Sequence, residues 1–263
     1  MPVRLGINPI GWTNDDMPEL GDDTPLEVCL EEARAAGYDG IELGRKFPRT
    51  AGALRPLLAR HGLSLVSGWY GASLQTRSAR EEIEAMQPDI ELLEAMGCSV
   101  IVFAEVGRSV HAQREVPRSR RPTLGHDDWA RFGERLMEVA GEPVGLLLDT
   151  GHLTYAGGNL LRIARRHARR LAHVHCKDVR PGALAEVHRS DLSFLEAVLA
   201  GVFTVPGDGV IDWGALLPIL KSVGYSGWLA VVEAEQDPAV ADPATYGRLG
   251  FTNLSRAAAA AGL

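Results

Sequence analysis

The stretch EAMGCSVIVFAE, residues 94–105, decides the fold, because a helix end, one glycine and an apolar strand follow each other directly. The same order returns in ARAAGYDGIEL (33–43), ARHGLSLVSGW (59–69) and KSVGYSGWLAVVE (221–233). A residue at positive φ commonly ends a helix, and glycine adopts that conformation without strain. The glycines at these helix ends are Gly37, Gly62, Gly97 and Gly224. The chain is therefore expected to repeat a helix–turn–strand unit.

Seven apolar runs are expected to form the strands. They are residues 3–8, 40–43, 63–68, 99–104, 144–149, 171–176 and 228–233. Runs without polar alternation, joined by helices, are typical of a parallel sheet covered by helices, with right-handed crossovers. Closure of such a sheet predicts an α/β fold, a (β/α) barrel of the TIM type, with the active site at the carboxyl ends of the strands.

Helix starts fit this order. Thr24, Pro25 and Glu27 are expected to form a capping box, and Asp212 is expected to cap a later helix.

The bulk properties favour one soluble enzyme domain over residues 1–263. A net charge of -7 opposes a nucleic-acid partner, and the basic run at 162–170 is interpreted as a solvated helix face. The three cysteines lack paired or metal-type spacing, which indicates free thiols. Without an apolar leader or a bilayer-length segment, we expect a cytoplasmic protein with no membrane contact.

Charged residues cluster where three of the expected strands end. Asp149 ends GLLLD, His175 lies in HVHCKD, and Glu233 ends WLAVVE. Strand alternation is expected to turn all three inward, together with Leu147, His173 and Val231. Two nearby carboxylates in a partly desolvated pocket repel each other unless a cation neutralises them. These residues are therefore predicted to bind one divalent metal ion.

Each of these residues has an alternative role. Asp149 can cap the following turn, His173 fits a core histidine, and Lys177 can be a surface lysine instead of a catalytic acid or base. Glu235 is the alternative to Glu233 and is expected to contact the metal's surroundings or the substrate.

Further polar and aromatic residues follow the strands, and loops at that end of a barrel carry substrate contacts. The expected substrate-binding residues are Trp12, Asn14, Lys46, Trp69, His111 and Glu235. Glu42, at the end of the second strand, is expected to be a polar substrate contact. The polar stretch 108–121 is too long for a simple connector and is expected to form a lid that brings His111 or arginines to the substrate.

Seven segments together resemble the inosose dehydratase family, and they run almost from end to end. They are PIGWTNDDMPELG (9–21), ELGRKFPR (42–49), SGWYGASL (67–74), LLLDTGHLTYAGG (146–158), HVHCKDVR (173–180), VFTVPGDGVIDW (202–213) and VVEAEQDP (231–238). The LLDTGH and HVHxKD segments also mark the wider group of xylose-isomerase-like barrels.

The resemblance implies loss of water from 2-keto-myo-inositol, a cyclic polyhydroxy ketone, through a metal-stabilised enediolate, giving a trihydroxycyclohexane-1,2-dione. It implies manganese or cobalt held by Asp149, His175 and Glu233, with His152 as a neighbour of substrate or metal. The resemblance also implies that Lys177 and Glu42 are the catalytic base and acid, in either order.

One departure from the family is expected to matter. The helix DDWARFGERLMEVA (127–140) runs almost directly into the strand at 144–149, so the fifth βα unit is predicted to be absent. Relatives supply a metal-side group from that unit, so the site is expected to be one ligand short. A partner copy of the chain or a rearranged lid would cover the open strand edges.

Three other functions compete with the dehydratase. A ketose isomerase or epimerase would use the same metal chemistry, and a barrel that has lost activity would only bind polyols. A metal-dependent endonuclease needs a basic groove and more histidine ligands, which the acidic balance and the 8 histidines disfavour.

Overall fold

The computed structural model describes residues 3–141, 144–232 and 236–263. One seven-stranded parallel sheet forms its centre, in the order β4-β3-β2-β1-β9-β6-β5. The strands are β1 (Arg4–Ile7), β2 (Gly40–Leu43), β3 (Ser64–Ala72), β4 (Ile101–Glu105), β5 (Leu146–Asp149), β6 (Leu171–Cys176) and β9 (Trp228–Val231). All seven overlap the predicted runs.

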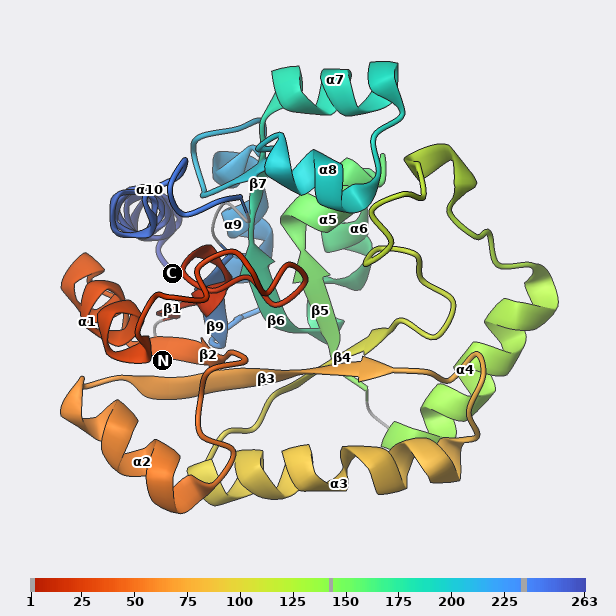
Figure 1. Cartoon of the computed structure of the whole chain (residues 1–263), viewed down its shortest axis with the longest axis horizontal. Coiled ribbons are helices and arrows are strands. Elements are labelled where there is room, and N and C mark those ends of the chain that lie inside the picture. Colours follow the sequence, from red (N-terminus) through yellow and green to blue (C-terminus); the bar gives the residue numbers. More distant parts are fainter. Residues whose placement is uncertain (1–2, 142–143, 233–235) are drawn as a thin grey trace.

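Helices surround this sheet (Figure 1). They are α1 (Leu26–Ala36), α2 (Ala51–Arg60), α3 (Ala79–Met96), α4 (His126–Ala140), α5 (Thr150–Tyr155), α6 (Leu160–His167), α7 (Pro181–Ser190), α8 (Phe194–Leu199), α9 (Trp213–Ser222) and α10 (Pro243–Ala261). Short 3₁₀ turns lie at η1 (Pro9–Gly11), η2 (Arg118–Arg120) and η3 (Ala168–Arg170). No described helix is both long and apolar enough to cross a membrane.

The helix ends follow the glycines as predicted. Gly37, Gly62, Gly97 and Gly224 all have positive φ, between 64° and 113°. Asp212 caps α9 by accepting a hydrogen bond from the amide of Ala215 at 2.8 Å, which confirms that prediction. The capping box at α1 was wrong: Pro25 occupies the N-cap position, and no side chain there accepts an amide hydrogen bond.

Small residues let the sheet curl. Gly6 of β1 pairs with Gly40 of β2 on one side and with Ala230 of β9 on the other. A Cβ on Gly6 would come within 2.8 Å of a methyl group of Val66, and a Cβ on Gly40 within 2.7 Å of it. The interior therefore has no room for a side chain at either position. Trp228 joins Val66 and Ala230 to fill this end of the interior.

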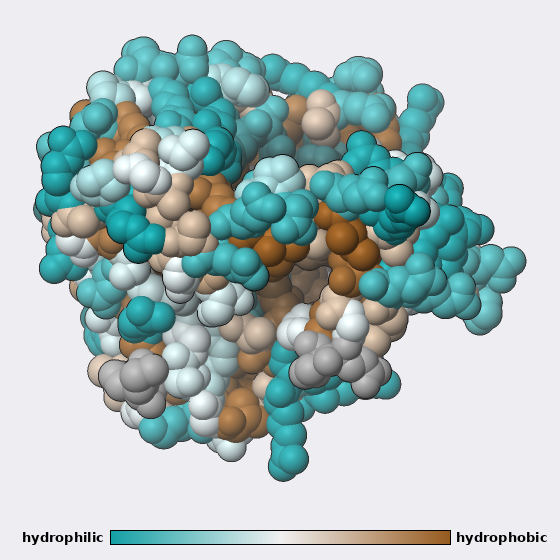
Figure 2. All heavy atoms as spheres, turned by 90° about the horizontal axis from the view of Figure 1, so that it is seen from below, coloured by the Kyte–Doolittle hydropathy of each residue, from teal (hydrophilic) through white to brown (hydrophobic). Residues whose placement is uncertain are grey.

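The sheet is open where the fifth unit was predicted to be missing. Among the described strands no ladder joins β4 to β5, and these two strands are the edges of the sheet. Figure 2 shows a hollow in one face of the molecule, with apolar residues along its walls. The incomplete barrel is therefore confirmed, and two strands' backbone groups lack a neighbouring strand.

A small antiparallel pair was not predicted from the sequence. Its strands are β7 (Asp178–Val179) and β8 (Phe203–Thr204). The carboxylate of Asp178 organises this region, because it accepts hydrogen bonds from the amides of Gly207 (3.0 Å) and Ile211 (2.9 Å) and from the indole of Trp213 (3.0 Å). A fully buried acid with these donors fixes the loop between β8 and α9.

Asp178→Asn is expected to lower the free energy of unfolding by about 2–4 kcal/mol, because a new N–H₂ would face N–H donors inside the protein. Urea unfolding followed by circular dichroism measures the change. The control Asp39→Asn removes an exposed ion pair of 3.7 Å to Arg34 and should cost less than about 1 kcal/mol. Equal losses in both variants would contradict the proposed role of Asp178.

Candidate metal and catalytic site

Asp149 and His175 lie opposite each other on neighbouring strands, β5 and β6, as strand alternation predicted. Nδ1 of His175 lies 3.4 Å from Oδ2 of Asp149. The other oxygen of Asp149 accepts the amide of His152 at 2.7 Å and caps α5. Asp149 therefore acts both as a helix cap and as a partner of His175.

Glu42 of β2 reaches the same point from across the barrel. Its Oε1 lies 3.0 Å from Nε2 of His173 and 3.1 Å from Nε2 of His175. The Ser67 hydroxyl also donates to Oε1, at 2.5 Å, and the Asn8 amide donates to Oε2 at 2.7 Å. Glu42 is 3% exposed, so this carboxylate is held on all sides by protein donors.

The charges of this cluster depend on one another. Burial by itself would raise the pKa of Glu42, but the two imidazoles hold it well below its usual range. Burial lowers the pKa of His175, whereas the carboxylates of Glu42 and Asp149 raise it, with a net increase to about 10. Without a metal ion, a proton on His175 thus balances the buried negative charge.

The donor atoms of Glu42, His173 and His175 lie within 4.8 Å of one another and can hold a metal ion. Separations near 3 Å suit two ligands of one ion with bonds of about 2.1 Å. Nδ1 of His173 is buried without a hydrogen-bond partner among the described residues. His173 is buried at 2% exposure, as the core interpretation expected, and its Nε2 also belongs to this donor set, whose chemistry fits a divalent cation.

Lys177 directly follows β6, the strand that carries His173 and His175. It is 1% exposed, and its Nζ lies 3.0 Å from Nε2 of His152 and 4.6 Å from the ring centroid of Phe203. Burial lowers the pKa of Lys177 to about 8, although the negative charge of Asp149 opposes that shift. The surface-lysine alternative is therefore wrong.

Glu42, His175 and Lys177 line one cavity of about 310 Å³, and His173 lies behind them in the interior. Two residues predicted to bind substrate, Trp69 and His111, line it, and so do the loop residues Asn8, Asp15 and Asp16. Trp69 is 54% exposed, as expected for an aromatic ring at the mouth of a binding site. The cavity is large enough for a six-carbon ring.

Three residues expected to bind substrate do not line this cavity. Trp12 is buried, and its indole donates to Glu32 at 2.6 Å. Asn14 is buried and accepts the amides of two following residues, at 2.9 Å and 2.7 Å. Lys46 donates to the carbonyl oxygens of the loop at Gly21, Asp22 and Thr24. Asn14 and Lys46 supply partners for backbone groups of the first loop, which need internal hydrogen bonds, and Trp12 joins this loop to α1.

Glu233 and Glu235 lie outside the described residues. The metal-ligand prediction for Glu233 therefore stays a prediction. Val231 was expected to face inward, but it packs against α10, where a Cβ on Gly250 would lie 3.0 Å from its methyl group. Ala230 and Val232 occupy the inner side instead, and Val232 lines the cavity.

The pairing of Glu42 with both histidines was missed from the sequence. The sequence indicated each residue separately, Glu42 as a candidate base or acid and His173 as a core residue. The signal was their common position on inward faces of strands that end at the same edge. Ser67 and Asn8, which hold Glu42, carry no distinctive motif.

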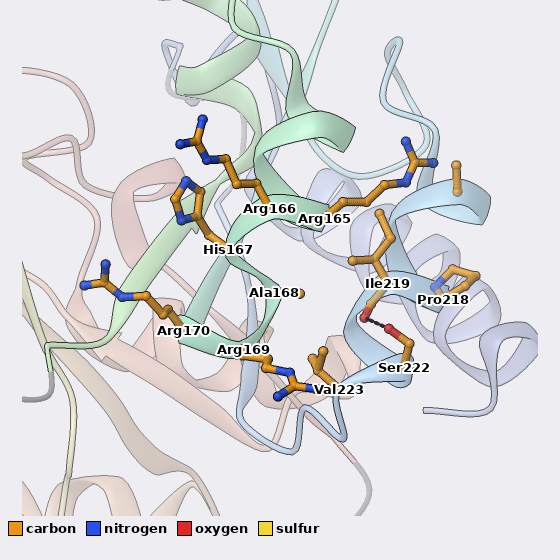
Figure 3. A pocket seen from close by; sticks show the side chains of 11 residues that line it. Arg165, Arg166, His167, Ala168, Arg169, Arg170, Pro218, Ile219, Ser222 and Val223 are labelled. Carbon is orange, nitrogen blue, oxygen red and sulfur yellow. Dashed lines mark hydrogen bonds between the residues drawn. The ribbon is translucent and has the colours of Figure 1, made fainter.

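A second hollow lies between α6, η3 and α9 (Figure 3). Its arginines belong to the basic run that was interpreted as a solvated face. Figure 3 shows Arg165, Arg166 and Arg170 pointing away from one another, so their charges do not converge on one ligand. This hollow has no feature of a catalytic site.

The fold agrees with comparisons to known proteins. A model of the family described as "Xylose isomerase-like TIM barrel" matches residues 30–143 and 141–249, so the match divides where the sheet is open. A solved L-ribulose 3-epimerase superposes with a TM-score of 0.67 at 17% identity, over 99% of this chain and 96% of that one. This likeness shows the shared fold.

Curated relatives extend the match over the whole chain. The rhizopine catabolism protein MocC of Rhizobium meliloti is 45% identical over an alignment of 295 residues, which covers 100% of this chain and 90% of that protein. This alignment is 32 positions longer than the chain of 263 residues, so the relative carries residues that this chain lacks. The inosose dehydratase of Geobacillus thermodenitrificans (strain NG80-2) is 41% identical, with 93% of each chain covered. The chain therefore belongs to the xylose isomerase-like TIM barrel family, in the group that includes the inosose dehydratases.

Proposed function

We propose that this protein is a metal-dependent hydro-lyase that removes water from 2-keto-myo-inositol and yields a trihydroxycyclohexane-1,2-dione, as a step of inositol catabolism. The names of relatives at 36–45% identity support the reaction class. The observation that carries the proposal is the convergence of the donor atoms of Glu42, His173 and His175 beside the cavity that Glu42, His175 and Lys177 line.

The proposed cofactor is Mn²⁺ or Co²⁺, because mixed carboxylate and imidazole ligands suit these ions better than Ca²⁺. When bound, the cation polarises the substrate carbonyl and stabilises negative charge on its oxygen. Glu42, His173 and His175 would hold it. Asp149 would orient His175 through the second ring nitrogen, as carboxylates commonly do for metal-bound histidines.

One side chain of this protein, Lys177, can transfer both protons of the elimination. Nζ of Lys177, in its neutral form, would take the proton from the carbon next to the carbonyl. The departing hydroxyl group needs one proton to leave as water, and the ammonium so formed can supply it. Glu42, proposed earlier as a base or acid, is ionised and held by four donors, so it fits a ligand better than a proton carrier.

The absent fifth unit does not prevent this chemistry. Three protein ligands with open positions for water or substrate are a common arrangement in catalytic metal sites. The neighbouring Trp69 and His111 lie in the same cavity and would contact the ring and its hydroxyl groups.

Incubation of the protein with 2-keto-myo-inositol and Mn²⁺ tests the reaction. The expected result is an ultraviolet-absorbing dione formed with loss of one water per turnover, identified by mass spectrometry. An epimerised or isomerised ketone that has not lost water would contradict the dehydratase proposal and indicate an epimerase or isomerase. Saturable binding of the ketone without any product would show a barrel that only binds polyols.

His173→Ala is expected to weaken Mn²⁺ binding by more than roughly 100-fold, because loss of a group one step further from a metal already costs 10–100-fold. Electron paramagnetic resonance of free Mn²⁺ measures the affinity without any substrate. The control His188→Ala removes an exposed imidazole of α7 and should bind like the unmodified protein. Unchanged Mn²⁺ binding in the His173 variant would show that His173 is not a ligand and would contradict the proposed metal site.

Lys177→Met is expected to lower kcat by about 10²–10⁴-fold, because a positioned proton-transfer group contributes that factor. Mn²⁺ affinity should stay within a few-fold of the unmodified protein, since Lys177 is not a ligand. Lys221→Met, on the surface of α9, is the matched control and should retain full turnover. A Lys177 variant with normal kcat would assign proton transfer to another group.

A further inference from the structure

The segment between β4 and α4 occupies the side of the molecule where the barrel is open (Figure 1). It docks on the turn between α7 and α8. The amide of Arg118 donates to the carbonyl of Leu192 at 3.2 Å, and the amide of Ser119 donates to Asp191 at 2.9 Å. Asp191 has a φ of 48°, an unusual value for a residue with a side chain, so this contact fixes a strained turn.

A cavity of about 360 Å³ lies between this segment, the end of β4 and α5. It is distinct from the metal cavity but shares the walls formed by His111, His152 and Phe194. One water needs only about 30 Å³ of space, so the cavity is sized for a ligand rather than for a single water.

Three polar atoms at this cavity are buried without a hydrogen-bond partner among the described residues: Nε of Arg118, the hydroxyl of Tyr155 and Oε1 of Gln75. Tyr155 and Gln75 are each 7% exposed. Buried polar groups are almost always paired in folded proteins, and an unpaired one costs about 1–3 kcal/mol. All three atoms belong to the lining of one cavity, so a single bound ligand can pair with them.

The charge of the cavity is positive. Arg118 and Arg121 form no ion pair with the described residues, and both lie near enough to Tyr155 to oppose the effect of burial on its pKa. Arg108 is neutralised by Asp128 at 3.1 Å. The carboxylate of Glu105 accepts the amides of Leu74 at 2.6 Å and Gly107 at 2.9 Å and adds one negative charge, so the two arginines leave the lining net positive.

We propose that this cavity is a binding site for an anionic oxygen group, a carboxylate or a phosphate, held by the guanidinium of Arg118 and the hydroxyl of Tyr155, with the charge of Arg121 in support. Arginine and phenol donors match the acceptor oxygens of such a group, and charge-assisted hydrogen bonds are the strongest kind available there. Oε1 of Gln75 accepts from a hydroxyl group on the same ligand.

The wall shared with the metal cavity gives two sources for this anionic group. It can be a substituent of a polyhydroxy ring that lies in the metal cavity, or it can be a free anion. Anion binding here does not depend on the dehydratase reaction, so each proposal can fail without the other.

Isothermal titration of the metal-free protein with inorganic phosphate tests the site. Binding is expected in the millimolar range, and Arg118→Met should weaken it by about tenfold. Tyr155→Phe keeps the ring and the fold and should weaken it several-fold. Arg165→Met removes one charge from the diverging arginines at η3 and α6 and should bind phosphate like the unmodified protein.

A second titration with myo-inositol 1-phosphate and with myo-inositol separates the two sources. Tighter binding of the ring phosphate than of either inorganic phosphate or myo-inositol assigns the anionic group to a ring ligand. Equal affinity for inorganic phosphate and the ring phosphate assigns a free anion. No phosphate binding by the unmodified protein, or equal losses in the Arg118 and Arg165 variants, would overturn the proposal.

Discussion

The contact of Glu42 with His173 and His175 is the constraint on which the rest of the structure depends. Glu42 is on β2 and the histidines are on β6, with β1 and β9 between them in the sheet. At about 4.8 Å per strand, a flat sheet would separate them by about 14 Å, yet their side-chain atoms approach to 3.0 Å. The sheet must therefore curl tightly. Glycine at residues 6 and 40 makes this possible, because a side chain at either position would collide with Val66.

The open side of the barrel has a structural cost and a consequence. β4 and β5 keep backbone groups without a strand partner, and α4 has no buried residue, with Trp129 of that helix 59% exposed. The missing unit would normally cover these surfaces. The segment after β4 covers part of the opening instead and is held by Asp191. This substitution creates a cavity with unpaired donors beside the metal cavity, so the loss of one unit changes the surroundings of the site and leaves its three convergent donors in place.

The sequence predicted the features that local chemistry determines. Apolar runs gave the strands, helix ends fell at glycines such as Gly97, and alternation on neighbouring strands placed Asp149 beside His175. It could not predict the contact of Glu42 across the barrel, because that depends on how strongly the sheet curls. The loop after β1 misled in another way. Trp12 and Lys46 have the chemistry of substrate contacts, but Trp12 donates to Glu32 of α1 and Lys46 donates to carbonyl oxygens of this loop, which only the folded chain reveals.

Two buried acids show how structural and functional carboxylates differ in this chain. Asp178 is satisfied by backbone amides and an indole, all of which can only donate, so these partners cannot become ligands of a cation. Glu42 is satisfied partly by imidazole nitrogens. An imidazole that gives up its proton becomes an acceptor and a metal ligand, so the donors around Glu42 can turn into a ligand set without moving the backbone. Burial and hydrogen bonding alone do not separate the two acids. What separates them is whether their partners can change from donor to acceptor.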